Sequence, residues 1–171
     1  MTKRNVMIQM ITSRIQIASQ LFEELSPEEE EELEEPATED GSSEVTEIWI
    51  EGRLVTNPHR VELVYDEGEL SGMEGSVTSI GYDRDNPALV TMMRSGPVST
   101  AMVFEEGKRH FCVYDTPFSS FQICVRALTV ENRLLSDGTL ILEYLIEIQG
   151  AQAERCRMTV KVNESRDLFP S

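Results

Sequence analysis

Alternation of side-chain character in the middle of the chain is the feature that most constrains its fold. Three runs, Val98–Glu105, Arg109–Thr116 and Phe121–Val130, alternate from residue to residue and are rich in β-branched and aromatic side chains. A period of two with this composition predicts β-strands and not helices. Gly107 and Pro117 stand between the runs, where glycine accepts a positive φ and proline presets a turn. We therefore predict three antiparallel strands joined by two hairpin turns.

The two turns also predict which side chains share a face of the sheet, because a tight turn fixes the register of its strands. A turn centred between Glu106 and Gly107 pairs Met102 with Phe111, and a turn centred on Phe118 pairs Phe111 with Val125. The face expected to meet the core then carries Met102, Phe104, Phe111, Val113, Phe121, Ile123 and Val125. The opposite face is mixed in polarity and is expected to be partly solvated; it carries Ala101, Val103, His110, Cys112, Tyr114, Gln122, Cys124 and Arg126.

Runs of the same kind recur along the rest of the chain. Further strands are predicted at Asn5–Ile17, Glu44–Leu54, Arg60–Tyr65, Ser76–Tyr82, Leu89–Arg94, Thr139–Gln149 and Glu154–Val162. Segments rich in Gly, Pro, Asn and Asp separate most of them, as expected for turns. Successive hairpins form an antiparallel meander, and a long meander commonly removes its edges by closing. The sequence therefore predicts an all-β fold, one domain over residues 1–171, with about eight to ten strands closed into a barrel.

Charge is concentrated in one segment. The formal net charge is −16, and thirteen acidic residues but no Lys or Arg lie between Leu21 and Glu47. The remainder of the chain carries 18 acidic and 15 basic residues. The body of the protein therefore lacks the basic stripe that phosphate contacts need, and no nucleic-acid binding is expected. Residues 21–43 include a helix-start signature at Ser26 and Pro27 but no apolar face, which predicts an insertion that is partly disordered or helical.

The remaining compositional signals bear on partners and compartment. The run Glu28–Glu35 is a candidate docking segment for a basic protein partner, although such runs are more commonly a solvated surface. No apolar run is long enough for a membrane span and no signal peptide is recognised, so we expect a protein of the reducing cytoplasm. The three cysteines lack a CxxC spacing, so no metal site is expected, and the sequence gives no reason to expect a cofactor. Cys112 and Cys124 are expected opposite each other as buried thiols, and residues 163–171 as a loose tail.

One segment resembles a known family. The stretch RSGPVSTAMVFEEGKRHFCVYDTPF from Arg94 to Phe118, with Asn132-Arg133-Leu134 and EYLIEIQG further on, is similar to the bacterial YwiB-like family, a domain of unknown function. The resemblance implies a calycin- or lipocalin-like β-barrel with a potential lumen, from bacterial cytoplasm and without an established activity. Ser119 stands where the family pattern leads us to expect glycine, and the acidic insertion is longer than usual, so nothing is carried over to that insertion.

A barrel of this size either fills its interior with side chains or holds one small ligand there. Our leading hypothesis is a non-catalytic binding module for a small, mainly apolar ligand, with a lumen lined by Met102, Phe104, Phe111, Val113, Val125 and Tyr144. Arg94 is the candidate to hold an anionic ligand group at the mouth, since a guanidinium matches a carboxylate or phosphate. The alternative is that the same apolar side chains fill the lumen and that Arg94 caps the barrel end.

The mixed face supplies two further hypotheses. His110 is expected opposite Arg126, with Tyr114 further along the same face. Glu147 is expected near Arg126, and such a set of side chains is typical of general acid–base chemistry. The same residues are equally typical of the solvated outer wall of a barrel. The other hypothesis is a protein-interaction domain that uses the acidic segment or this outer face.

Overall fold

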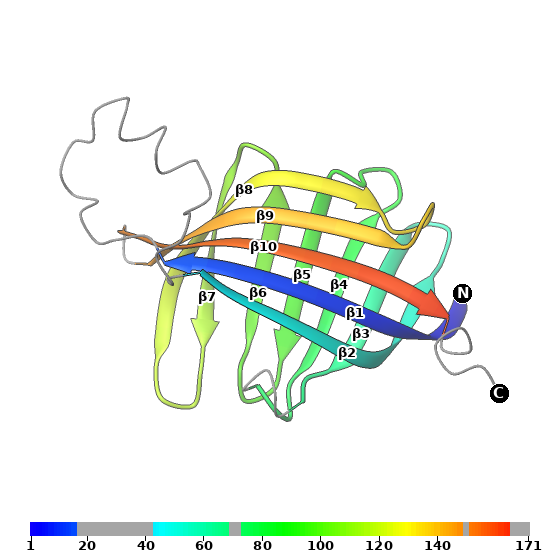
Figure 1. Ribbon diagram of the computed structural model, residues 1–171, viewed down its shortest axis with the longest axis horizontal. Coiled ribbons are helices and arrows are strands. Elements are labelled where there is room, and N and C mark those ends of the chain that lie inside the picture. Colours follow the sequence, from blue (N-terminus) through cyan, green and yellow to red (C-terminus); the bar gives the residue numbers. More distant parts are fainter. Residues whose placement is uncertain (17–42, 69–72, 149–150, 165–171) are drawn as a thin grey trace.

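The computed structural model describes residues 1–16, 43–68, 73–148 and 151–164, which form an all-β structure of ten strands (Figure 1). The strands are β1 (Thr2–Gln16), β2 (Ser43–Thr56), β3 (Arg60–Asp66), β4 (Val77–Asp83), β5 (Leu89–Ser95), β6 (Thr100–Glu105), β7 (Arg109–Asp115), β8 (Ser120–Arg133), β9 (Thr139–Ile148) and β10 (Ala151–Glu164). None of the described residues forms a helix with the length and apolarity that a membrane crossing requires.

The strands form one antiparallel meander that nearly closes on itself. Each pairs with its neighbours in sequence, except across the break between β6 and β7, and β10 pairs along its length with β1. At this break, which we call the seam, Ser99 and Asp115 exchange two backbone hydrogen bonds of 2.9 and 2.8 Å. In Figure 1, β1, β2, β9 and β10 cross in front of β3 to β6, as expected for a barrel. The predicted meander is therefore confirmed.

The first predicted hairpin is wrong in its pairing. No ladder joins β6 to β7 in the described residues, and the one bridge, Ser99 to Asp115, is offset by one residue from the expected pairing of Met102 with Phe111. Gly107 has a φ of 80° in the turn, as predicted, but its N–H donates to Ala127 O of β8 at 2.9 Å. Lys108 N–H closes the turn by donating to Glu105 O of β6 at 2.9 Å, while Gly107 extends the β7–β8 pairing beyond Arg109.

The second predicted hairpin forms, but with a slip of one residue. Its loop spans four residues, closed by a 2.9 Å hydrogen bond from Thr116 N to Ser119 O, so the turn centres before Phe118 and not on it. Phe111 consequently pairs with Cys124, and the faces of β7 are reversed while those of β8 are as predicted. Phe111 and Val113 are 70% and 57% exposed on the outside, and their predicted place in the core is wrong. Phe121 is also partly exposed, whereas Ile123 is buried as predicted.

The interior is filled at one end of the barrel. At the end where odd-numbered strands begin and even-numbered strands finish, large apolar side chains lose all contact with solvent; they include Ile8, Leu63, Val90, Phe104, Val125, Leu140 and Val160. Phe104 packs edge-on against Tyr144, with ring centroids 4.8 Å apart and an interplanar angle of 61°. Each such side chain contributes about 1.5–3 kcal/mol on burial. We call this region the filled end and the opposite end of the barrel the open end.

Two boundary predictions fall at the limits of the described residues. β10 runs to Glu164, and Asn163 pairs with Met7 of β1, so the expected tail begins later than residue 163. The rest of that tail, residues 165–171, lies outside the described residues. The acidic insertion at 21–43 also lies outside them, except that Ser43 begins β2 opposite Ile15.

Candidate functional site

The open end of the barrel contains a cavity of about 400 Å³. Side chains from nine of the ten strands, all but β4, line it, together with Glu67 and Met73 of the segment that follows β3. The lining comprises Met10, Thr12, Arg14, Glu44, Thr46, Ile48, Tyr65, Glu67, Met73, Met92, Arg94, Met102, Tyr114, Phe121, Ile123, Tyr144, Ile146, Ile148, Glu154, Cys156 and Met158. Alternation along the strands explains this set, because every second residue of a strand faces the inside of the barrel. The inward-facing residues that lie beyond the filled end therefore line the cavity.

The cavity is layered along the barrel axis. On β5, Val90 is wholly buried in the filled end, Met92 follows two positions later, and Arg94 follows two positions after that. Two long strands repeat this order, with Ile8, Met10 and Thr12 on β1, and with Val160, Met158 and Cys156 on β10. On these three strands, apolar side chains form the floor of the cavity, methionines form its middle, and polar groups or Cys156 lie towards its mouth. On β8 and β9 the lining stays apolar up to the mouth, with Phe121, Ile146 and Ile148. Thioether side chains are flexible and adapt to the shape of what they contact.

Arg94 is held inside the cavity by polar contacts with Thr78, Glu67 and the thioether sulfur of Met92. Its Nε donates to Thr78 Oγ1 at 2.9 Å, and its Nη2 donates to Glu67 Oε1 at 3.2 Å. Thr78 in turn donates to the same Glu67 oxygen at 2.7 Å. The side chains of Arg94 and Glu67 are 9% and 3% exposed, so this is a buried ion pair whose charges offset each other.

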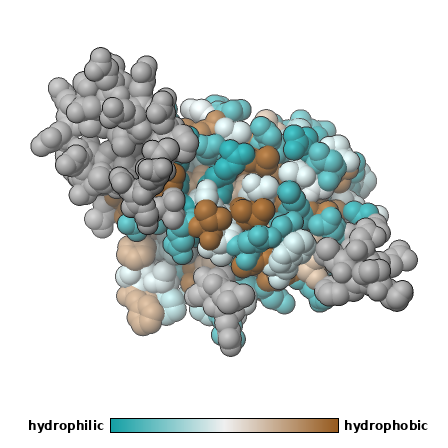
Figure 2. All heavy atoms as spheres, in the orientation of Figure 1, coloured by the Kyte–Doolittle hydropathy of each residue, from teal (hydrophilic) through white to brown (hydrophobic). Residues whose placement is uncertain are grey.

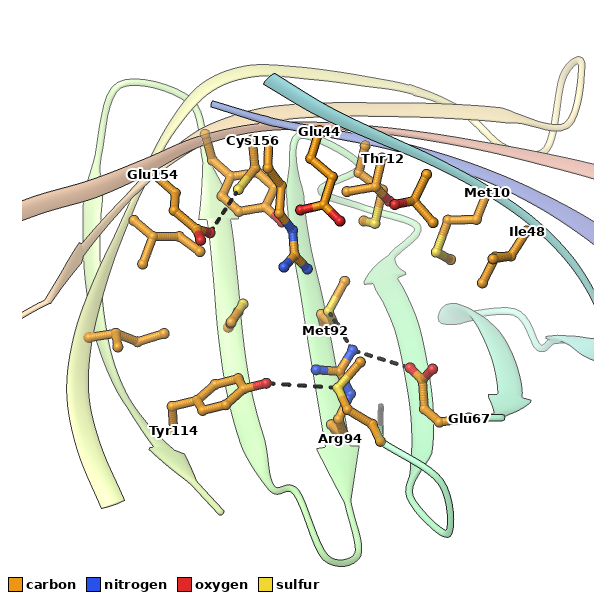
Figure 3. A pocket seen from close by; sticks show the side chains of 18 of the residues that line it. Met10, Thr12, Glu44, Ile48, Glu67, Met92, Arg94, Tyr114, Glu154 and Cys156 are labelled. Atoms are coloured by element: carbon orange, nitrogen blue, oxygen red, sulfur yellow. Dashed lines mark hydrogen bonds and ion pairs between the residues drawn. The ribbon is translucent and has the colours of Figure 1, made fainter. Parts of the chain in front are cut away.

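One edge of the Arg94 guanidinium faces the cavity. Within the described part of the chain, no acceptor lies at hydrogen-bonding distance and geometry from Nη1. No buried side-chain nitrogen or oxygen in the described residues lacks a partner, so Nη1 is not sealed in the wall. Figure 3 shows Arg94 between Glu67 and Tyr114 on one side of the pocket, with Thr12, Glu44 and Cys156 on the other. Arg94 can therefore donate hydrogen bonds to a molecule in the cavity.

Three tyrosines add neutral polar groups. The Tyr65 hydroxyl donates to Met10 Sδ and the Tyr114 hydroxyl to Met73 Sδ, each at 3.8 Å. Burial raises the pKa of Tyr65 well above its usual value, and the charge of Glu67 raises it further. Burial likewise raises the pKa of Tyr144. The phenols of Tyr65 and Tyr144 therefore stay protonated at neutral pH and carry no charge into the lumen.

The cysteine in the lining is not an activated nucleophile. Cys156 is 1% exposed, and its thiol lies 3.8 Å from Glu154 Oε2. Burial, followed by the negative charge of Glu154, raises the pKa of Cys156 to about 12. A thiol with such a pKa is protonated at neutral pH, whereas nucleophilic and metal-binding cysteines act as thiolates.

The predicted ligand residues divide into three groups. Arg94, Met102 and Tyr144 line the cavity. Phe104 and Val125 are fully buried in the filled end and do not reach it. Phe111 and Val113 lie on the outer surface. Met10, Met92, Met158, Glu67 and Thr78 were not among the predicted ligand residues. Strand alternation indicates that such residues face inward, but it does not indicate which end of the barrel is hollow.

The predicted polar cluster does not assemble, because the barrel wall separates its members. Tyr114 lines the cavity, and His110 Nε2 lies 3.1 Å from Glu105 Oε1 near the seam. Glu147 is on the outer face, where Arg109 Nη2 lies 3.2 Å from its Oε1. Arg126 pairs with Arg109 in the ladder, not with His110 as predicted. The one-residue slip of the second hairpin accounts for both errors.

The cysteines are also separated from one another. Cys112 pairs with Ile123 and Cys124 with Phe111, so the expected opposition of Cys112 and Cys124 is wrong. All three cysteines are free. No group of three or more His, Cys, Asp or Glu side chains within the described ranges is arranged to hold a metal ion.

Comparison with known proteins gives a fold and a family but no activity. The crystal structure of the ywiB protein from Bacillus subtilis is similar to this chain with a TM-score of 0.58, covering 92% of each chain at 16% sequence identity. This likeness concerns the fold alone and agrees with the resemblance seen in the sequence. No curated protein matches the chain. Residues 32–160 match the family described as a domain of unknown function, DUF1934, and the chain belongs to that family.

Proposed function

We propose that this protein is a non-catalytic binding module that holds a small, mainly apolar ligand in the open end of its barrel. The observation that carries the proposal is the cavity of about 400 Å³ beside a fully packed core in the same barrel. Its size lies within the range of small-molecule sites, about 300–1,000 Å³, and its apolar lining with a few polar groups is typical of them. A barrel that needed its interior only for stability would have no reason to leave one end unfilled.

The chemistry of the lining favours binding over catalysis. The Cys156 thiol is protonated at neutral pH, and Glu67 is engaged by Arg94 and Thr78. His110 is bonded to Glu105 and does not line the cavity. The lining therefore offers hydrogen-bond donors and apolar contacts but no pair of groups poised for proton transfer.

A fluorescence titration tests the proposal. N-phenyl-1-naphthylamine, a neutral apolar dye, is expected to bind saturably with one site and enhanced emission. The variant Thr12→Trp places an indole in the cavity and is expected to weaken binding at least about tenfold. Ser13→Trp is the matched control, because Ser13 is the next residue of β1 and faces outward, and it should bind like the unaltered protein. Absence of saturable binding, or equal loss in both variants, would refute a lumenal site.

A second candidate function is protein interaction through the outer face of the β7–β8 hairpin. Phe111, Val113 and Phe118 are 70%, 57% and 95% exposed there, and contiguous exposed apolar side chains commonly mark interaction sites. In Figure 2 apolar and polar side chains alternate over the visible face without one dominant patch. The variant Phe111→Ser with Phe118→Ser should abolish any self-association detected by sedimentation and leave dye binding unchanged.

A further inference from the structure

On the wall formed by β1, β5 and β10, the lining changes from apolar at the floor to polar at the mouth, which constrains how a ligand lies against it. The free Nη1 edge of Arg94 is near the mouth, and Met92 lies two positions deeper on the same strand. Beyond the methionines, the floor is formed by wholly buried apolar side chains such as Val90 and Ile8. A ligand with one hydrogen-bond acceptor and an apolar body therefore matches this wall with its acceptor at Arg94 and its body towards the floor.

The charges of the lining constrain the acceptor. Three carboxylates, from Glu44, Glu67 and Glu154, face two guanidinium groups, from Arg14 and Arg94. The charge of Arg94 is already offset by Glu67 inside the wall. An anionic ligand would bring a further negative charge into a lining with an excess of carboxylates, and like charges close together repel each other. An ammonium group would leave Nη1 of Arg94 without a partner, because it donates hydrogen bonds and accepts none.

We propose, building on the lumenal binding function above, that the ligand is a neutral amphiphile: a flexible hydrocarbon chain that ends in an uncharged oxygen, such as a hydroxyl or amide carbonyl. The oxygen accepts a hydrogen bond from Arg94 Nη1, and the chain lies among Met10, Met92, Met102 and Met158. This differs from the anionic ligand group that the sequence suggested for Arg94. The difference arises from Glu67, which the sequence pattern did not connect with Arg94.

A series of ligands with the same chain tests this inference. Decanol, decanamide, decanoate and decylammonium are compared at neutral pH by displacement of N-phenyl-1-naphthylamine from the full-length protein. Decanol and decanamide are expected to displace the dye at concentrations at least about tenfold lower than decanoate or decylammonium. A preference for decanoate or decylammonium, or equal displacement by all four, would overturn the inference and leave the lumenal binding function intact. Failure of the dye itself to bind would instead refute the binding function.

A charge-altering variant tests the reason for the preference. Glu67→Gln keeps an amide oxygen for Thr78 and Arg94 but removes the negative charge that offsets Arg94. Decanoate is therefore expected to gain about tenfold relative to decanol in this variant. Glu47→Gln is the matched control, because Glu47 is exposed on the outer face of β2, where it accepts a hydrogen bond from Gln9, and its relative affinities should be unchanged. An unaltered decanoate-to-decanol ratio in a folded Glu67→Gln protein would contradict the assignment to Arg94.

Discussion

Arg94 and Glu67 meet inside the barrel wall, with 3.2 Å between Nη2 and Oε1 and both side chains almost fully withdrawn from solvent. The pair links the end of β5 to the segment after β3, and Thr78 of β4 bonds to both partners. Strands β4 and β5 and the segment after β3 thus each place one polar group at the open end. This arrangement fixes the guanidinium in position and leaves one of its edges towards the cavity.

Removal of Arg94 should destabilise the fold more than removal of an exposed arginine. Arg94→Met leaves the Glu67 carboxylate buried without its cation, and such a change costs about 3–5 kcal/mol. Arg133→Met is the control, because Arg133 and its partners Glu131 and Asp137 are about half exposed, and its loss should cost less than about 1 kcal/mol. Urea unfolding followed by circular dichroism measures both. The double variant Arg94→Met with Glu67→Gln should recover part of the loss; equal stability of Arg94→Met and Arg133→Met would be contrary to a buried pair.

Two phenylalanines test the register of the β7–β8 hairpin. Phe104 is completely buried and contacts Tyr144, so Phe104→Ala is expected to lower the free energy of unfolding by about 3–5 kcal/mol. Phe111 is 70% exposed, so Phe111→Ala should change it by no more than about 0.5 kcal/mol. The same measurement of urea unfolding serves for both variants. A large loss in Phe111→Ala would restore the inward orientation that the sequence pattern suggested.

Alkaline pH should reduce the stability of the protein partly through Cys156. The folded protein holds the pKa of this thiol at about 12, above the ordinary value of 9.0. The unfolded chain therefore releases the proton first, and the contribution is fully present below about pH 9 and is lost as the pH rises towards 12, on the order of 1 kcal/mol per pH unit. Urea unfolding across this range should show a shallower decline for Cys156→Ala than for the unaltered protein. Identical pH dependence of stability in the two proteins would show that folding does not raise the pKa of Cys156.

The seam between β6 and β7 should open more readily than the rest of the barrel. Ser99 and Asp115 form the bridge across it, whereas Ile8 lies in a strand with complete ladders on both sides. Opening such a short bridge breaks few hydrogen bonds, so the amides of Ser99 and Asp115 are expected to exchange with solvent much faster than that of Ile8. Hydrogen exchange followed by NMR measures this directly. Equal protection at all three positions would show that the barrel is closed as firmly there as elsewhere.

Local patterns in the sequence were sufficient to predict the strands and the meander, but not the register with which the strands close the barrel. Alternation placed the ten strands, and the inward phase of Ile123 and Val125 was correct. Turn residues identified the hairpin at Pro117 but left its centre uncertain by one residue, which is enough to reverse the faces of β7. The phase of Phe111 could not be recovered from polarity, because the inward residues of that strand, His110, Cys112 and Tyr114, are no more apolar than the outward ones.

The binding site was less predictable than the fold because it depends on contacts between distant strands. Arg94 was identifiable as a polar residue at a strand end, but its partner Glu67 lies in a turn-rich segment with several other acidic residues. Which acid reaches the guanidinium depends on the pairing of β3, β4 and β5. The hollow of the open end likewise depends on the balance of side-chain volumes across the whole barrel, which strand alternation does not encode.

Methyl NMR of the methionines tests the central claim, a ligand in the open end of the barrel, most directly. Five of the eight methionines line the cavity, Met10, Met73, Met92, Met102 and Met158, and three do not, Met1, Met7 and Met93. Met92 and Met93 are adjacent in the chain, with one side chain facing the cavity and the other 56% exposed. On addition of decanol to protein with labelled methionine methyl groups, the account predicts shifts and ligand contacts for Met92 and the other cavity methionines, with Met93 unchanged. Shifts confined to Met1, Met7 and Met93, or none at saturating decanol, would contradict it.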